Sequence, residues 1–142
     1  VMALGHWGAR WIGSRLRDDE LDAGLLMWDM RRFACIDEFP PRAVIIHFSF
    51  RDARAGEGNW WLVVEHGVAD LCRDDPGREL TLVVDATVRA LTEVWTGDRI
   101  PLEVLESREL RVDGPAQDAK DLWRWLGTSA FAGTRRAALE RQ

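Results

Sequence analysis

The stretch Leu80–Gly114, LTLVVDATVRALTEVWTGDRIPLEVLESRELRVDG, decides the fold of this chain. In its opening residues an apolar face of Leu80, Leu82 and Val84 alternates with a second face, which predicts a strand. Asp85, at the end of that strand, is placed to cap the helix that follows. Apolar residues then recur three and four positions apart until Gly97, which predicts the end of that helix. Pro101 suits the first turn of a short second helix, after which strand alternation resumes. The stretch therefore predicts a strand, two helices and a strand.

The same patterns extend to the rest of the chain. The expected strands lie near residues 44–50, 60–66, 68–73, 79–85 and 109–113. The expected helices lie near residues 22–33, 87–96, 101–107 and 115–126. This order predicts an α+β fold, in which a largely antiparallel five-stranded sheet has helices packed on one face. A sheet and helices in this arrangement can part to leave an apolar tunnel, which suits apolar small molecules.

Composition narrows the functional classes. The net charge of −5 argues against a nucleic-acid-binding surface on this segment, because such surfaces are basic. Cys35 and Cys72 form no metal-binding motif and no disulfide framework, so no metal is expected and a reducing cytoplasm is the simplest compartment. No apolar run is long enough for a membrane-spanning helix, and no signal peptide is visible. A start at Val1 leads us to expect a fragment of a longer chain.

Catalytic motifs are missing from the sequence. It contains neither G-x-S-x-G nor H-E-x-x-H, and its three histidines, His6, His47 and His66, are dispersed. A G-x-G at 56–58 is not followed by a helix, so it predicts no nucleotide site. We therefore expect no enzymatic activity and no cofactor.

The eight tryptophans, with no tyrosine, supply flat apolar surface for a core, a ligand cavity or an interface. The helix at 22–33 is apolar over more than one stripe, so it is covered on several sides or lines a cavity. In the helix at 115–126 the spacing predicts Trp123 on the inner side and Trp125 at the flank.

Two polar residues have two interpretations each. Arg32 either pairs with Asp29, three residues before it, or reaches inward to hold an anionic head group. His47, in mid-strand, is either a ligand contact or general base, or a structural side chain. The candidate ligand-binding residues are Met27, Trp28, Arg32, His47, Phe48, Trp61, Leu91 and Trp95.

Three segments also resemble a known family: GLLMWDMRR at 24–32, WWLVVE at 60–65 and the stretch 82–115. Together they resemble the sterol-carrier-protein-like domain that follows a winged helix in HxlR-type bacterial transcriptional regulators. The segment LGHWGARW at 4–11 is similar to the last helix of such a winged helix. The resemblance implies that residues 1–18 are the end of a winged-helix domain and a linker, that 19–132 are the ligand-binding domain, and that 133–142 are a flexible tail.

The resemblance implies an effector-binding sensor domain of a transcriptional regulator, which holds an apolar small molecule or lipid in a hydrophobic cavity. Such a domain would contact DNA only through an absent N-terminal domain, and it is a possible homodimer. The glycine and charge break near Gly13–Asp19 is the expected hinge. Two alternatives stay open: a stand-alone lipid or sterol carrier, which needs an exposed apolar rim, and a structural dimerisation domain without a ligand.

Overall fold

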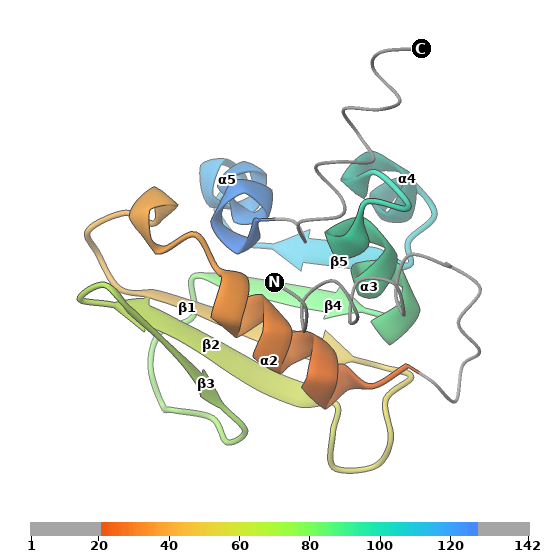
Figure 1. Cartoon of the computed structure of the whole chain (residues 1–142), viewed down its shortest axis with the longest axis horizontal. Coiled ribbons are helices and arrows are strands. Elements are labelled where there is room, and N and C mark those ends of the chain that lie inside the picture. The colour runs from red at the N-terminus through yellow and green to blue at the C-terminus, as the bar shows by residue number, and fades with distance from the viewer. Residues whose placement is uncertain (1–20, 128–142) are drawn as a thin grey trace, which may run out of the picture.

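A computed structural model describes residues 21–127 of the chain (Figure 1). Its helices are α2 (Ala23–Phe33), the 3-10 helix η2 (Ile36–Glu38), α3 (Val88–Thr96), α4 (Pro101–Glu106) and α5 (Ala116–Leu126). Its strands are β1 (Val44–Phe50), β2 (Asn59–Glu65), β3 (Val68–Cys72), β4 (Leu82–Ala86) and β5 (Leu110–Asp113). The predicted elements are all present, with ends that differ by a few residues. The segments assigned to the winged helix, the hinge and the tail lie outside the described residues.

The five strands form one sheet in the order β3-β2-β1-β4-β5. Strands β1 and β4 are parallel, and the other three neighbouring pairs are antiparallel. The predicted α+β class, with a largely antiparallel sheet, is therefore confirmed. The one parallel pair arises because the chain crosses from the edge strand β3 to the far side of β1 before it begins β4.

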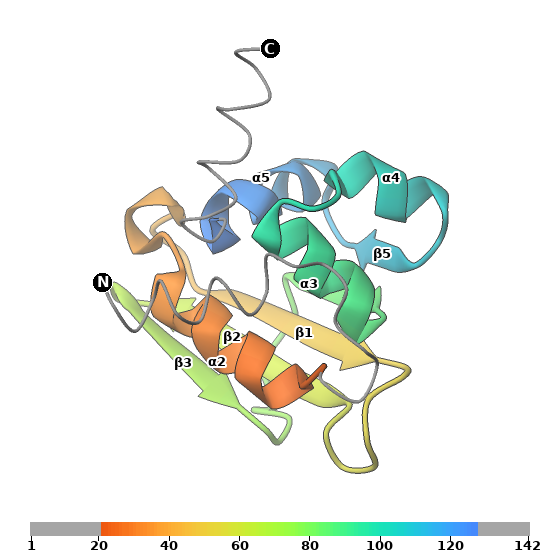
Figure 2. The ribbon, with the colours of Figure 1, turned by 45° about the vertical axis from the view of Figure 1, so that its right-hand side comes forward.

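Strand β1 shows how the sheet divides the molecule into two faces. Phe48 and its alternate neighbours belong to the main core, which also contains the buried residues of the helices. Ile45, on the other face, forms a separate small cluster with Trp61 and Val63. The helices therefore cover one face of the sheet, an arrangement that two views of the ribbon show (Figures 1 and 2).

The start of α3 differs from the sequence prediction. Asp85 is not the cap, because β4 continues through Ala86 and carries the Asp85 side chain on the open face, where it pairs with Arg51. Thr87 caps the helix instead, since its hydroxyl accepts a hydrogen bond of 3.0 Å from the Ala90 amide. The predicted end of the helix is confirmed, because Gly97 adopts a left-handed conformation with φ +85°.

The edge strand β3 has a contact with α2 that protects part of its backbone. The Arg31 side chain on α2 donates a hydrogen bond of 3.0 Å from Nε to the Ala69 carbonyl. Edge strands carry backbone groups that have no partner within the sheet. In this way a helix side chain satisfies one acceptor of the edge strand.

Arg99 forms ion pairs with three carboxylates, one on α3, one on α4 and one on the residue that precedes β5. Its guanidinium lies 2.7 Å from Glu109, 3.5 Å from Glu93 and 3.6 Å from Glu103. The hydrogen bond from Arg99 is the main cause that lowers the pKa of Glu109. Since Gly97 and Arg99 lie in the turn between α3 and α4, this cluster fixes the start of α4.

We expect Arg99→Leu to lower the free energy of unfolding by about 1–2 kcal/mol near pH 7, because three carboxylates lose a partner that is only 24% exposed. A carboxyl whose pKa is lowered by folding stabilises the protein above its unfolded pKa, and this contribution is lost as the pH falls through the folded pKa. The loss of unfolding free energy in Arg99→Leu should therefore be smaller at about pH 3 than at pH 7. Urea unfolding at both pH values measures it.

The matched control is Arg111→Leu, which removes an exposed pair with Asp113 and should cost only a few tenths of a kcal/mol. An equal loss at the two pH values would show that the apolar stem of Arg99, and not its ion pairs, stabilises the turn.

Candidate functional site

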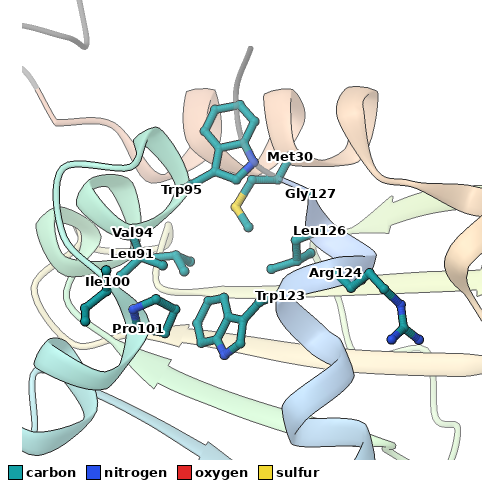
Figure 3. Close-up of a pocket in the computed structure, with 10 residues that line it drawn as sticks. All are labelled: Met30, Leu91, Val94, Trp95, Ile100, Pro101, Trp123, Arg124, Leu126 and Gly127. Atoms are coloured by element: carbon teal, nitrogen blue, oxygen red, sulfur yellow. The ribbon is translucent and has the colours of Figure 1, made fainter. Parts of the chain in front are cut away.

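A pocket of about 370 Å³ opens between α3, the start of α4 and α5 (Figure 3). Its volume lies within the range of about 300–1,000 Å³ that is usual for small-molecule sites. Its lining residues are Met30, Leu91, Val94, Trp95, Ile100, Pro101, Trp123, Arg124, Leu126 and Gly127.

Two glycines end the helices that flank the opening. Gly97 ends α3 and turns the chain toward Pro101, so that α4 starts beside the pocket. Gly127 ends α5 with φ +69°, a conformation that other residues rarely adopt. The fully buried side chains of Met30 and Leu91 lie on the inner side, and the exposed Ile100 lies at the mouth.

The pocket wall is mainly apolar. Among residues 21–127, Arg124 is the single charged residue in the lining, and its guanidinium points away from the pocket (Figure 3). There it contacts Glu38 at 2.9 Å and Asp121 at 3.3 Å. Its charge is thus already paired, so the pocket offers mainly apolar contacts to a ligand.

Further apolar side chains are exposed on α4 and just before it. Ile100, Leu102 and Leu105 are all exposed, and we call these three residues the α4 rim. Ile100 belongs to both the rim and the pocket lining. Exposed apolar side chains near an apolar pocket make this end of α4 a candidate contact surface for another apolar phase or partner.

The structure places four of the eight candidate residues in or near the main core. Leu91 and Trp95 line the pocket. Met27 and Phe48 are fully buried in the core between the helices and the sheet, and neither lines the pocket.

The other four candidates lie away from the pocket. Trp28 is exposed on α2, and Arg32 is exposed and lies 3.6 Å from Asp29. His47 and Trp61 stack on the open face of the sheet, with ring centroids 4.6 Å apart, and His47 Nε2 lies 2.9 Å from the Asn59 side-chain oxygen. The eight residues are therefore not brought together in one site.

Sequence reasoning placed Trp123 on the inner side of α5, but not in a pocket. Trp123 is half-buried and lines the pocket. Trp125, predicted at the flank, is fully buried and stacks on Phe39 at 5.1 Å, because the segment that follows α2 covers that flank. Helical spacing indicates which face of α5 is inside, but the same spacing serves a core and a pocket wall.

Within residues 21–127, no group of three or more histidine, cysteine or carboxylate side chains is arranged to hold a metal ion. In the same range, none of the helices combines the length and the apolar character that crossing a lipid bilayer requires.

No protein-family profile matches the sequence, and no curated protein matches it either. Solved structures do match. A double mutant of the sec-alkyl sulfatase PisA1 superposes with a TM-score of 0.59, at 14% sequence identity over 82% of this chain. The stereoselective inverting sec-alkylsulfatase Pisa1 from Pseudomonas sp. superposes with a TM-score of 0.56, at 13% sequence identity over 70% of this chain. This chain spans only 17% and 15% of those proteins.

The ubiquinone synthesis protein UbiJ-SCP2 matches over nearly its whole length. Its TM-score is 0.55 at 12% identity, over 73% of this chain and 91% of that one. At these identities the likeness concerns the fold alone. The fold is sterol-carrier-protein-2-like, as the sequence segments had indicated, and the comparisons lend no support to the HxlR regulator context.

Proposed function

We propose that this domain binds a lipid or a similar apolar small molecule in the pocket between α3, α4 and α5, and that it acts as a carrier. The observation that carries the proposal is the mainly apolar pocket of about 370 Å³, together with the exposed α4 rim, of which Ile100 lines the pocket. A purely structural domain needs neither feature. The sterol-carrier-protein-2-like fold supports the proposal.

The α4 rim favours a carrier over a sensor, since a carrier has to pass an apolar ligand to and from an apolar phase. The effector-binding role in a regulator stays a second hypothesis. It requires a DNA-binding segment outside the described residues, and a ligand that favours one arrangement of the two parts. Either role is binding without catalysis, and a homodimer is compatible with both.

Native mass spectrometry of the purified full chain tests the proposal. We expect a fraction with about a few hundred daltons of extra mass, which is lost on denaturation and identifies the ligand. A sample without extra mass should still take up a fluorescent apolar probe into the pocket. A chain that carries no extra mass and takes up no probe would contradict the proposal.

We expect Leu102→Glu to slow the transfer of a fluorescent fatty alcohol between neutral phosphatidylcholine vesicles by about threefold or more, because a charge on the rim opposes contact with apolar chains. Leu102 does not line the pocket, so the affinity for the probe in solution should be retained. The rate at which the fluorescent alcohol moves between donor and acceptor vesicles is measured by fluorescence energy transfer.

The matched control is Val68→Glu, because Val68 is 54% exposed and Leu102 is 58% exposed, but Val68 lies on β3. Transfer at the wild-type rate in this control would locate the effect at the rim. Equal slowing by both variants would indicate a general effect of charge and would argue against a role for α4.

A further inference from the structure

Helices α2 and α3 are neighbours on the same face of the sheet, and we call the place where they meet the seam (Figures 1 and 2). Phe33 of α2 and Trp95 of α3 meet across it, with ring centroids 6.2 Å apart. Residues three or four positions apart share a helix face. Asp29 therefore lies on the seam one turn before Phe33, and Thr92 lies on it one turn before Trp95.

Both residues carry a buried oxygen without a hydrogen-bond partner in the described part of the chain. Asp29 is 4% exposed and its Oδ2 has no partner, and Thr92 is 3% exposed and its Oγ1 has none. The other carboxylate oxygen of Asp29 lies 3.6 Å from Arg32. An unsatisfied buried polar group costs about 1–3 kcal/mol, so two of them on one seam require an explanation.

The electrostatics of Asp29 agree with this geometry. Burial raises the pKa of its carboxyl, and the nearby Arg32 only partly offsets that effect. A hydrogen-bond donor placed against Oδ2 would favour the charged form of the group and would satisfy the oxygen.

The seam adjoins the pocket at Trp95, which contacts Phe33 and also lines the pocket. Met30, the residue after Asp29, and Trp95, on the same face of α3 as Thr92, both line the pocket. Figure 3 shows these two side chains at the end of the pocket nearest α2. Met30 and Trp95 are both buried, but Met30 is unbranched and adapts its shape readily, so a shift of its side chain would let a ligand reach the seam.

We propose that Asp29 and Thr92 form the head-group end of the pocket, where they accept a hydrogen bond from the hydroxyl or ammonium group of a ligand whose apolar part lies in the pocket. This inference rests on the proposed binding function. A donor head group satisfies the buried acceptor, whereas a fatty-acid carboxylate brings a second negative charge to a buried acid. The site should therefore select long-chain alcohols or amines against fatty acids.

The test uses three probes with the same tail: dodecanol, dodecylamine and dodecanoate. Each displaces a fluorescent apolar probe from the full chain, below its micelle concentration. We expect the alcohol or the amine to bind about tenfold or more tightly than dodecanoate. Which of the two binds best distinguishes a hydroxyl ligand from an ammonium ligand.

Asp29→Asn should reduce this preference to about threefold or less, because it removes the charge that rejects dodecanoate. The matched control is Asp70→Asn, an exposed aspartate on β3, which should retain the preference. Thr92→Val removes the hydroxyl at nearly constant volume, and it should weaken the binding of dodecanol by about threefold while leaving dodecanoate unchanged. Thr92→Val tests the head-group assignment if Asp29→Asn fails to fold.

Two failures can be told apart. Equal affinity for the three probes, tighter binding of dodecanoate, or a preference unchanged in Asp29→Asn and in Thr92→Val would overturn the head-group assignment and leave the pocket as a binding site. If none of the probes and no apolar fluorophore binds, the proposed function fails, and the head-group assignment fails with it.

Discussion

Phe48→Ala is expected to lower the free energy of unfolding by about 3–5 kcal/mol, because it opens a cavity at the centre of the main core. Phe48 is fully buried on β1, the central strand, where it lies in register with Trp60 of β2 and Val84 of β4. Natural domains have about 5–15 kcal/mol of stability, so the loss is a large part of the total. Urea unfolding measures it.

The folded fraction of Phe48→Ala should still bind an apolar probe with wild-type affinity, since Phe48 does not line the pocket. Trp123→Ala should show the opposite behaviour. It removes a half-buried side chain from the pocket wall, so we expect about tenfold weaker probe binding and a smaller loss of stability. Loss of probe affinity in Phe48→Ala alone would instead place the ligand between the sheet and the helices.

Gly114→Ala is expected to destabilise the protein by about 2–4 kcal/mol, since it combines an overpacked contact with a strained backbone. Gly114 follows β5 with φ +146°, a conformation that residues with a side chain rarely adopt. A methyl group there would lie 2.6 Å from both the Thr81 carbonyl oxygen and the Leu82 side chain. The carbonyl is backbone, so β4 and β5 would have to separate at their ends.

The control for this substitution is Gly77→Ala. Gly77 also has a positive φ, +71°, but nothing lies within 4 Å of the added methyl group. It should cost only about 1–2 kcal/mol, the penalty of the backbone conformation. Thermal unfolding of the two variants separates strain from contact, and an equal loss in both would show that Gly114 has no steric role.

Local patterns were sufficient to predict the elements, because alternation and helical spacing are properties of neighbouring residues. Gly97 and Pro101 marked the boundaries of α3 and α4 correctly. Asp85 was assigned as a cap because a short polar side chain suits a strand end and a cap equally well. The parallel pairing of β1 with β4 depends on a crossing between distant segments, which local spacing does not encode.

The candidate site was harder to predict, for a related reason. Periodicity indicates that Phe48, Leu91 and Trp95 face inward, but it does not distinguish a filled core from a pocket wall. Leu91 and Trp95 line the pocket because two helices end nearby, which is a property of the assembled fold. Asp29 was interpreted only as a partner of Arg32, since its burial is visible only in three dimensions.

The hydrogen bond from Arg31 to the Ala69 carbonyl has a consequence for how copies of this protein behave in concentrated solution. A bare sheet edge invites strands of other molecules to add to it, and repeated addition leads to fibrils. Here a guanidinium occupies an acceptor on β3, and the opposite edge strand, β5, is only four residues long. The Arg31 side chain on α2 thus helps to prevent aggregation through the sheet edge, a role that is independent of ligand binding.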